Sequence, residues 1–312
     1  MIPIKVEYSK FENIKKEYTK KAIELFQDKR CSDIDSAKDI IFKKINNELS
    51  KLNIKATIED IFVADYDTLK NIKKVLDKLN IIYNGYKRSK NNNKGKYVNE
   101  SVYKILYDKF DSLDKKWLIN QLGITVCPYC NRDFINNRKT SMSAQLDHFY
   151  PRSKYPIFAL SLYNLIPSCS ACNNIKRQNE IDVSPYDTSF DFSSKIRFSY
   201  VPLSAEYLND PTQLKVDIQY IDKFEKNIKN MQIDSAYEIH SDYVQELIKK
   251  AKIYTKAFRK ELLENYTGLI SSEEELNRIV FGNYMNKNDE EKRPLAKLTH
   301  DILEELGIIN DS

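Results

Sequence analysis

The chain has 312 residues, 41% of them hydrophobic and 30% charged, a composition typical of a soluble protein with a substantial core. This length exceeds that of most single domains, so we expect two or three cooperating units. The net charge of +5 is compatible with nucleic-acid binding but does not require it. No apolar run is long enough to cross a bilayer and residues 1–10 do not form a signal peptide, so we expect a cytoplasmic protein without a membrane partner.

The N-terminal third predicts a series of helices. Apolar residues recur at helical spacing in four stretches between Phe11 and Phe110, and no proline occurs in residues 4–127. A last short helix containing Trp117 should end near Gly123. A helical bundle without an active site is the better interpretation of this region.

One break in this region is the segment 86–96, which is basic and rich in asparagine and has no apolar periodicity. It predicts a mobile loop. Its positive charges could contact backbone phosphates, and a solvated insertion without function is the alternative.

Two Cys-x-x-Cys pairs follow the helical region. The first cysteine pair is Cys127 and Cys130, and the second cysteine pair is Cys169 and Cys172. Two such pairs supply the four sulfurs of a tetrahedral structural zinc site. The alternatives are four core thiols that happen to be paired in the sequence, or two disulfides, which the lack of a secretory signal disfavours. The fifth cysteine, Cys31, has no partner in the sequence and is predicted to be a buried thiol.

The chain between the two pairs carries further polar residues. Short segments at 133–135 and 143–146 flank a polar run and predict a hairpin, whose second strand would end at Asp147 and His148. Prolines then predict a long irregular loop leading to Asn164.

The second cysteine pair should open a helix over about residues 170–180. This helix would present Asn173 and Lys176 on neighbouring positions. Two strands and one helix would thus converge on a small concave site.

These residues resemble the HNH endonucleases, the ββα-metal nuclease family with a zinc-bound treble-clef frame. The similarity lies in Leu-Asp-His before Pro-Arg-Ser, then Tyr-Asn-Leu, then Cys-x-x-Cys-Asn-x-x-Lys. The resemblance implies that His148 is the general base and Asp147 a ligand of the catalytic metal. Asn164 would be the middle motif residue, and Asn173 would stand where many members have the final histidine.

The chemistry of phosphodiester hydrolysis fits these residue types. An imidazole with an unperturbed pKa of about 6.5 can deprotonate water near neutral pH. A hard cation held by Asp147 and the amide oxygen of Asn173 would keep open positions for phosphate and water. Mg²⁺ is the expected ion and Mn²⁺ a substitute. Asn174 would replace Asn173 as the ligand if the helix were rotated by one position.

Each of these positions has a plainer interpretation. An isolated Asp-His pair is usually a surface or capping feature, and Asn164 is more simply a residue that orients the imidazole through the backbone. Four basic residues near the site in sequence could bind the substrate phosphates: Lys176 is ranked first, and Arg152, Lys154 and Arg177 are ranked equally behind it. The alternative is that they are solvated, as most lysines and arginines are.

The C-terminal part predicts strands at 191–200 and 214–220, followed by helices. One helix should run from Ser241 almost to Gly268, a short one should begin with a capping box near Ser272, and a last one should begin at Pro294. His240 and His300 lie outside the motif. We expect both histidines to have core or capping roles rather than to bind a metal.

The sequence as a whole predicts an α+β protein. Its expected divisions are a helical domain at 1–122, a nuclease core with the zinc site at 123–185, and short strands followed by helices at 186–312. The predicted reaction is metal-dependent hydrolysis of nucleic acid, with DNA favoured over RNA and without sequence preference.

A small HNH unit within large flanks is similar to the Septu and retron-associated nucleases of bacterial anti-phage systems. That resemblance implies a partner ATPase. Two alternatives stay open: an RNA nuclease, for example one that cuts tRNA, and a zinc-stabilised docking module without catalysis.

Overall fold

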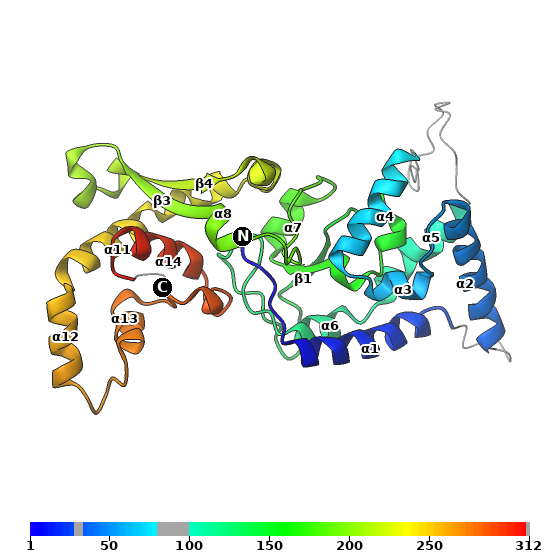
Figure 1. Ribbon diagram of the computed structural model, residues 1–312, viewed down its shortest axis with the longest axis horizontal. Helices are drawn as coiled ribbons and strands as arrows, with labels where there is room; N and C mark the ends of the chain where they lie inside the picture. The colour runs from blue at the N-terminus through cyan, green and yellow to red at the C-terminus, as the bar shows by residue number, and fades with distance from the viewer. Residues whose placement is uncertain (28–33, 80–99, 310–312) are drawn as a thin grey trace. The chain divides into compact units, whose positions relative to one another are not determined.

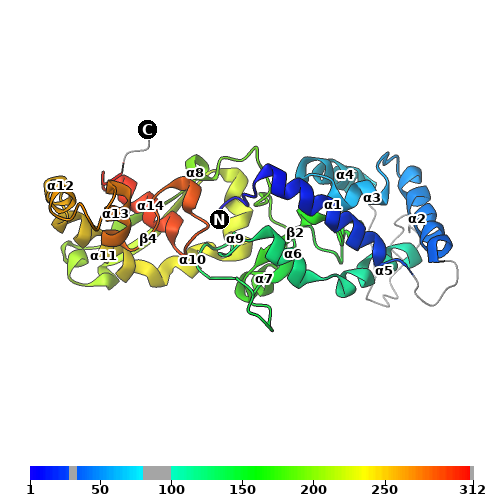
Figure 2. The ribbon, with the colours of Figure 1, turned by 90° about the horizontal axis from the view of Figure 1, so that it is seen from below.

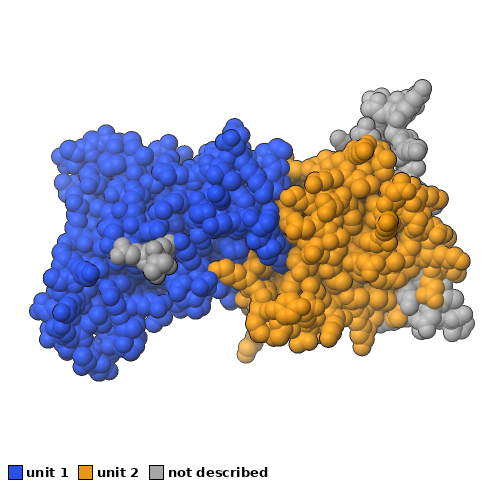
Figure 3. All heavy atoms as spheres, in the orientation of Figure 1, with its two compact units in different colours: residues 1–3, 124–136, 181–312 blue, residues 4–123, 137–180 orange. Residues whose placement is uncertain are grey.

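The structure, a computed structural model, describes residues 1–27, 34–79 and 100–309. It forms two compact units (Figure 3). Unit 1 contains Met1–Pro3, Ile124–Asn136 and Ile181–Ser312, and unit 2 contains Ile4–Gly123 and Asn137–Glu180. Helices combine with two small antiparallel sheets in the described ranges, so the predicted α+β class is confirmed. The predicted three-part division of the chain stays a prediction.

Unit 2 begins with the expected helices (Figure 1). They are α1 (Tyr8–Glu24), α2 (Ile34–Lys51), α3 (Ile58–Val63), α4 (Tyr66–Lys78), α5 (Glu100–Lys109) and α6 (Lys115–Leu122). Only α3 was not predicted; Thr57 starts it through a capping box with Asp60. Gly123 ends α6 with φ of 69°, a left-handed conformation that glycine adopts at low cost. The segment 86–96 and Cys31 lie outside the described residues.

In the small sheet of unit 2, the strand that ends at His148 pairs with a different segment from the one predicted. β1 (Gln145–His148) pairs antiparallel with β2 (Leu165–Ser168), with Asp147 opposite Ile166. The predicted hairpin between 133–135 and 143–146 is wrong, because Phe134 instead forms a bridge with Val126. β2 is buried at all four positions, and β1 gains more by pairing with this buried strand.

Helix α7 (Ser170–Lys176) follows β2 directly. It is shorter than the predicted helix over 170–180, because Arg177 takes φ of 44° and ends it.

Aromatic packing fixes the loop that joins β1 to β2. The rings of Phe149 and Tyr150 pack on Tyr66 of α4, and Phe158 packs on Tyr150. The buried hydroxyl of Tyr18 on α1 donates to the carbonyl of Leu160, 2.8 Å away. Helix α1 lies beside α3 (Figure 2). The helices of unit 2 therefore support the loop that leaves His148.

Unit 1 contains the second sheet and the C-terminal helices. The elements are α8 (Phe192–Lys195), β3 (Ile196–Pro202), β4 (Leu214–Tyr220), α9 (Glu225–Met231), α10 (Ile233–Tyr237), α11 (Ser241–Ile253), α12 (Lys256–Asn265), α13 (Glu273–Phe281) and α14 (Ala296–Glu305). Both predicted strands are present and pair antiparallel. Helix α14 packs on β3, where the backbone amide of Phe198 donates to Asp301.

The long helix predicted from Ser241 to near Gly268 is wrong. The chain leaves the helical conformation at Tyr254, and the hydroxyl of Thr255 caps the new helix α12 by accepting from the amide of Phe258. Helix α13 begins as predicted with Ser272 as its N-cap. Within the described ranges, no helix combines the length and the apolar character needed to cross a bilayer.

Candidate active site and metal centre

The first cysteine pair sits on a tight turn. The amide of Asn131 donates to the carbonyl of Cys127 at 2.8 Å, and the amide of Arg132 donates to Sγ of Cys130 at 3.4 Å. Asn131 closes the turn with φ of 53°, in the left-handed region that asparagine tolerates better than most residues. The turn therefore directs a backbone N–H group at a cysteine sulfur.

Asn131 also fixes this turn to the C-terminal part of unit 1. Its Nδ2 donates to the carbonyl of Glu290 at 2.9 Å, and its Oδ1 accepts from the amide of Lys297 at 3.0 Å. Its carbonyl accepts from the amide of Leu295 at 2.6 Å. The first cysteine pair is thus held by residues more than a hundred positions away in sequence.

The second cysteine pair begins α7. Cys169 is the N-cap residue of this helix, and its Sγ accepts from the amide of Cys172 at 3.4 Å. The helix that follows carries Asn173 and Lys176. The position of this cysteine pair therefore determines where those two side chains lie relative to β1.

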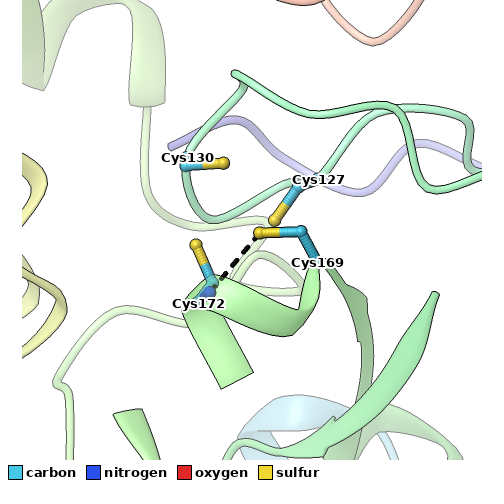
Figure 4. A group of neighbouring side chains, drawn as sticks. All are labelled: Cys127, Cys130, Cys169 and Cys172. Carbon is cyan, nitrogen blue, oxygen red and sulfur yellow. Dashed lines mark hydrogen bonds between the residues drawn. The ribbon is translucent and has the colours of Figure 1, made fainter. Parts of the chain in front are cut away.

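The four sulfurs lie together (Figure 4). All four ligand atoms are within 4.8 Å of one another, and all four cysteines are buried. Tetrahedral zinc with Zn–S bonds of about 2.3 Å requires sulfurs roughly 3.8 Å apart, so the set fits a structural zinc ion. The four cysteines could hold zinc as the sequence predicts.

His148 ends β1 with its ring bound on one side. Nε2 lies 3.0 Å from the carbonyl oxygen of Ala159, and the ring of Phe110 packs edge-on against the imidazole with 4.3 Å between centroids. A carbonyl oxygen can only accept, so Nε2 carries the proton and Nδ1 carries the lone pair. The backbone thus sets the tautomer of His148.

Burial keeps this imidazole neutral. The side chain is 8% exposed, and desolvation lowers the pKa of His148 to about 3, helped by the nearby charges of Arg152 and Lys176 and opposed by the bond to Ala159. His148 is therefore in its neutral, proton-accepting form at physiological pH.

Asp147 is bound by a buried lysine. Nζ of Lys176 lies 3.0 Å from Oδ2 of Asp147 and donates to the carbonyl of His148 at 2.7 Å. Both side chains are almost completely buried. Lys176 was predicted to contact substrate phosphate, and the structure places its ammonium group against β1 instead. Its predicted phosphate role stays untested, but its position links α7 to both predicted catalytic residues.

Asn173 lies one turn earlier on the same side of α7. Its Nδ2 donates to Oε1 of Gln145, which precedes Asp147 by two residues and so shares its face of β1. This bond identifies the nitrogen of the amide and leaves Oδ1 as the ligand atom that Asn173 offers. Asn174, the alternative ligand, is exposed on α7. Asn173 is therefore the residue that α7 directs to the face of Asp147.

Asn164 is fully buried, and its side chain forms hydrogen bonds with backbone groups. Its Oδ1 accepts from the amide of Tyr150 at 2.7 Å, and its Nδ2 donates to the carbonyls of Tyr150 and Phe158. These bonds close the loop that starts directly after His148. Asn164 thus orients the imidazole through the chain rather than by touching it.

The predicted phosphate-binding arginines have different surroundings. Arg152 forms an ion pair with Asp111 at 3.0 Å and stacks over the rings of Tyr107 and Phe110. Arg177 is exposed at the end of α7. Arg177 can approach a phosphate without losing a partner seen here, whereas Arg152 would have to share or exchange Asp111.

Sequence reasoning missed three contacts of the site. The carbonyl of Ala159 left no signal, because any residue supplies one, and Phe110 lies far away in sequence. Gln145 could have been found, because alternation along a strand places it on the same face as Asp147.

A second cluster of possible ligands lies in unit 1. Glu290, His300 and Asp301 place their ligand atoms within 4.8 Å of one another, but Nζ of Lys297 already lies 3.0 Å from both oxygens of Asp301. His240 accepts a hydrogen bond from Nε of Arg132. Neither histidine joins the candidate active site.

The comparisons agree with this geometry. No curated protein and no solved structure matched the chain. Among family models, the one described as HNH endonuclease matches residues 127–179, the segment that holds all four cysteines, β1, β2 and α7.

Proposed function

We propose that this protein is a metal-dependent endonuclease that hydrolyses the phosphodiester bonds of DNA. The HNH domain at 127–179 supports nuclease activity at the level of the family. The observation that carries the proposal is His148, whose buried ring is held by Ala159 in the tautomer that a general base needs.

In this proposal Nδ1 of His148 accepts a proton from the attacking water. The bond from Nε2 to the carbonyl of Ala159 then stabilises the charged ring, because imidazolium is a stronger hydrogen-bond donor than neutral imidazole. The pKa of about 3 belongs to the site without substrate. The singly charged phosphodiester beside the ring would raise it, because a negative charge favours the protonated form.

Asp147 and Asn173 would hold the catalytic cation. A carboxylate and an amide oxygen are hard ligands that suit Mg²⁺, with Mn²⁺ as a substitute. When bound, the ion would supply positive charge to the phosphate oxygens and the leaving group. Lys176 keeps the carboxylate of Asp147 in place and compensates its charge. Asn164 keeps the loop behind His148 closed.

The substrate would be bound through its backbone. The exposed Arg177 and the nearby Arg152 are our candidates for phosphate contacts, and phosphate contacts carry no sequence information. We therefore propose cutting without base preference. A role in bacterial anti-phage defence with a partner ATPase is the finer part of the proposal, and it rests only on the resemblance of a small HNH unit within large flanks.

The test is cleavage of supercoiled plasmid, single-stranded DNA and total RNA by the zinc-loaded full chain, with Mg²⁺, Mn²⁺ or EDTA. The His148→Ala variant should cut at least about 100-fold more slowly, since general base catalysis typically contributes that much. His240→Gln is the matched control, because its histidine lies outside the site and glutamine keeps an acceptor for Arg132. Normal cutting by His148→Ala would remove the proposed base.

The same panel separates the alternatives. Cutting of RNA but not DNA would favour an RNA nuclease with the same site, because neither the metal nor the base requires a 2′-hydroxyl. If neither nucleic acid is cut with either metal, alone or with the product of a neighbouring gene, a docking module becomes the better interpretation.

A further inference from the structure

Unit 1 contains a cavity of about 810 Å³ that shares no residue with the candidate active site. It lies among α12, α13, the segment 285–288 and the chain after α14. Thr255, Lys256 and Arg259 of α12 contribute to its wall, and so do Glu273 and Asn277 of α13. These two helices are labelled in Figure 1. The volume falls within the range of sites that bind small molecules and cofactors.

Arg259 is a buried cation whose hydrogen bonding is incomplete. Its side chain is 4% exposed and is held by one bond from its guanidinium to the carbonyl of Tyr254, at 2.7 Å. The nearest carboxylate oxygen of Glu273 is 4.0 Å away, at the limit of an ion pair. Within the described part of the chain, Nε of Arg259 has no hydrogen-bond partner. Buried arginines normally pair with an anion, so this group points to an anionic ligand.

Asn277 lines the same cavity and lacks a hydrogen-bond donor among the described residues. It is 6% exposed, and its Oδ1 has no hydrogen-bond partner among the residues that the structure describes. It lies four residues after Glu273, and therefore on the same side of α13. An amide oxygen can only accept, so a ligand here must bring an N–H or O–H group.

Two cations of the cavity lie near the N-terminal end of α12. Thr255 is the N-cap of α12, Lys256 is its first residue, and Arg259 follows one turn later. A helix N-terminus favours negative charge, and Lys287 is a further basic residue that lines the cavity. The acceptors Glu273, Glu274 and Asn277 lie on α13. A suitable ligand therefore combines an anionic group such as phosphate with hydroxyl or amino donors.

We propose that this cavity binds a nucleoside phosphate. The phosphate would pair with Arg259 and Lys256, displacing the exposed side chain of Glu273 from its distant contact. Hydroxyls of the sugar or the amino group of a base would donate to Asn277 and to the carboxylates of α13. Met285 and Ile308 supply apolar surface for the base. A free mononucleotide, rather than the nucleic acid cut at the other site, is the ligand whose size suits this volume.

The test is calorimetric titration of the zinc-loaded full chain with AMP, GMP, ATP and GTP, beside inorganic phosphate and adenosine. At least one nucleotide should bind about tenfold or more tightly than phosphate or adenosine. Arg259→Lys, which keeps the charge but removes Nε, should weaken that nucleotide at least about tenfold. Lys256→Ala, at an exposed position that need not disturb folding, should weaken it about threefold and lessen its salt dependence. Arg278→Lys, on α13 outside the cavity wall, is the matched control.

Three results would overturn the proposal: no nucleotide binds, the Arg259 and Lys256 variants bind as wild type does, or phosphate alone binds as tightly as every nucleotide. Zinc content and melting temperature show whether each variant is folded. Because the His148→Ala variant should still bind nucleotide, this proposal and the proposed nuclease function can fail separately.

Discussion

The two cysteine pairs are alike in sequence and differ in what holds them. The first is anchored by Asn131 to residues 290–297 of unit 1, and the second begins α7 and so positions Asn173 and Lys176 on β1. Each pair is associated with a fully buried lysine. The amide of Lys297 donates to Asn131 in the turn of the first pair, and Lys176 lies on the helix that begins at the second. The same motif thus anchors the chain at the first pair and positions site residues at the second.

The two buried lysines make the difference clear. Lys297 binds both oxygens of Asp301 within unit 1, and the amide of Phe198 donates to the same carboxylate. Lys176 binds Asp147, the proposed metal ligand, and the backbone of His148. A buried ion pair can therefore be purely structural or can support a reactive residue, and only its neighbours distinguish the two cases.

The largest effect should come from removing one zinc ligand of the second pair. Cys169→Ser should lose bound zinc and more than about 5 kcal/mol of unfolding free energy, because binding a structural metal is part of the folding free energy. Metal analysis and chemical denaturation measure both. Cys31→Ser is the control, since the fifth cysteine belongs to neither Cys-x-x-Cys pair. A Cys169→Ser variant with full zinc content and normal stability would contradict the four-cysteine site.

The next prediction separates the two lysines. Lys176→Met and Lys297→Met should each cost about 3–5 kcal/mol of unfolding free energy, because each leaves a carboxylate buried without its cation. Only Lys176→Met should also slow DNA cleavage per folded molecule, by about tenfold or more, since only it disturbs Asp147 and His148. Equal cleavage rates in both variants would show that Lys176 has a structural role alone.

A smaller loss is expected at Asn131. Asn131→Gly removes the two side-chain bonds and leaves the amide of Lys297 buried without its acceptor, at a cost of about 2–3 kcal/mol. Asn131→Ala should cost about 1 kcal/mol more, because alanine resists the left-handed φ. Urea denaturation of the two variants measures the difference. If alanine proves no worse than glycine, backbone strain at this turn is negligible.

The smallest effect concerns pH. The folded pKa of His148 is about 3 and its unfolded value about 6.5, so the unfolded chain binds a proton first as the pH falls. The contribution of His148 to stability should therefore decrease from about pH 6.5 downward. Between pH 7 and pH 5 the wild type should lose about 2 kcal/mol more than His148→Phe, measured as unfolding free energy. Equal losses would mean that the imidazole is not buried in its neutral form.

Local pattern was enough to predict several features of the molecule. The ligand spacing of the four cysteines, the end of a strand at His148, the start of a helix after Cys169 and the stop at Gly123 each depend on residues within a few positions of one another. The same locality explains two errors. Residues 133–135 have the pattern of a strand, but the buried β2 is a better partner for β1, and the apolar stripe after Ser241 continues across the break at Tyr254.

The sequence by itself therefore indicated which residues could hold zinc and which we propose as the base and the cation ligands. Only the tertiary structure decided how they are held. It buried Lys176 against Asp147, gave Nε2 of His148 a carbonyl from Ala159, tied the first cysteine pair to residues 290–297, and left Arg259 facing a cavity. These contacts join positions that share no local pattern, because burial and hydrogen bonding between distant segments depend on the whole fold.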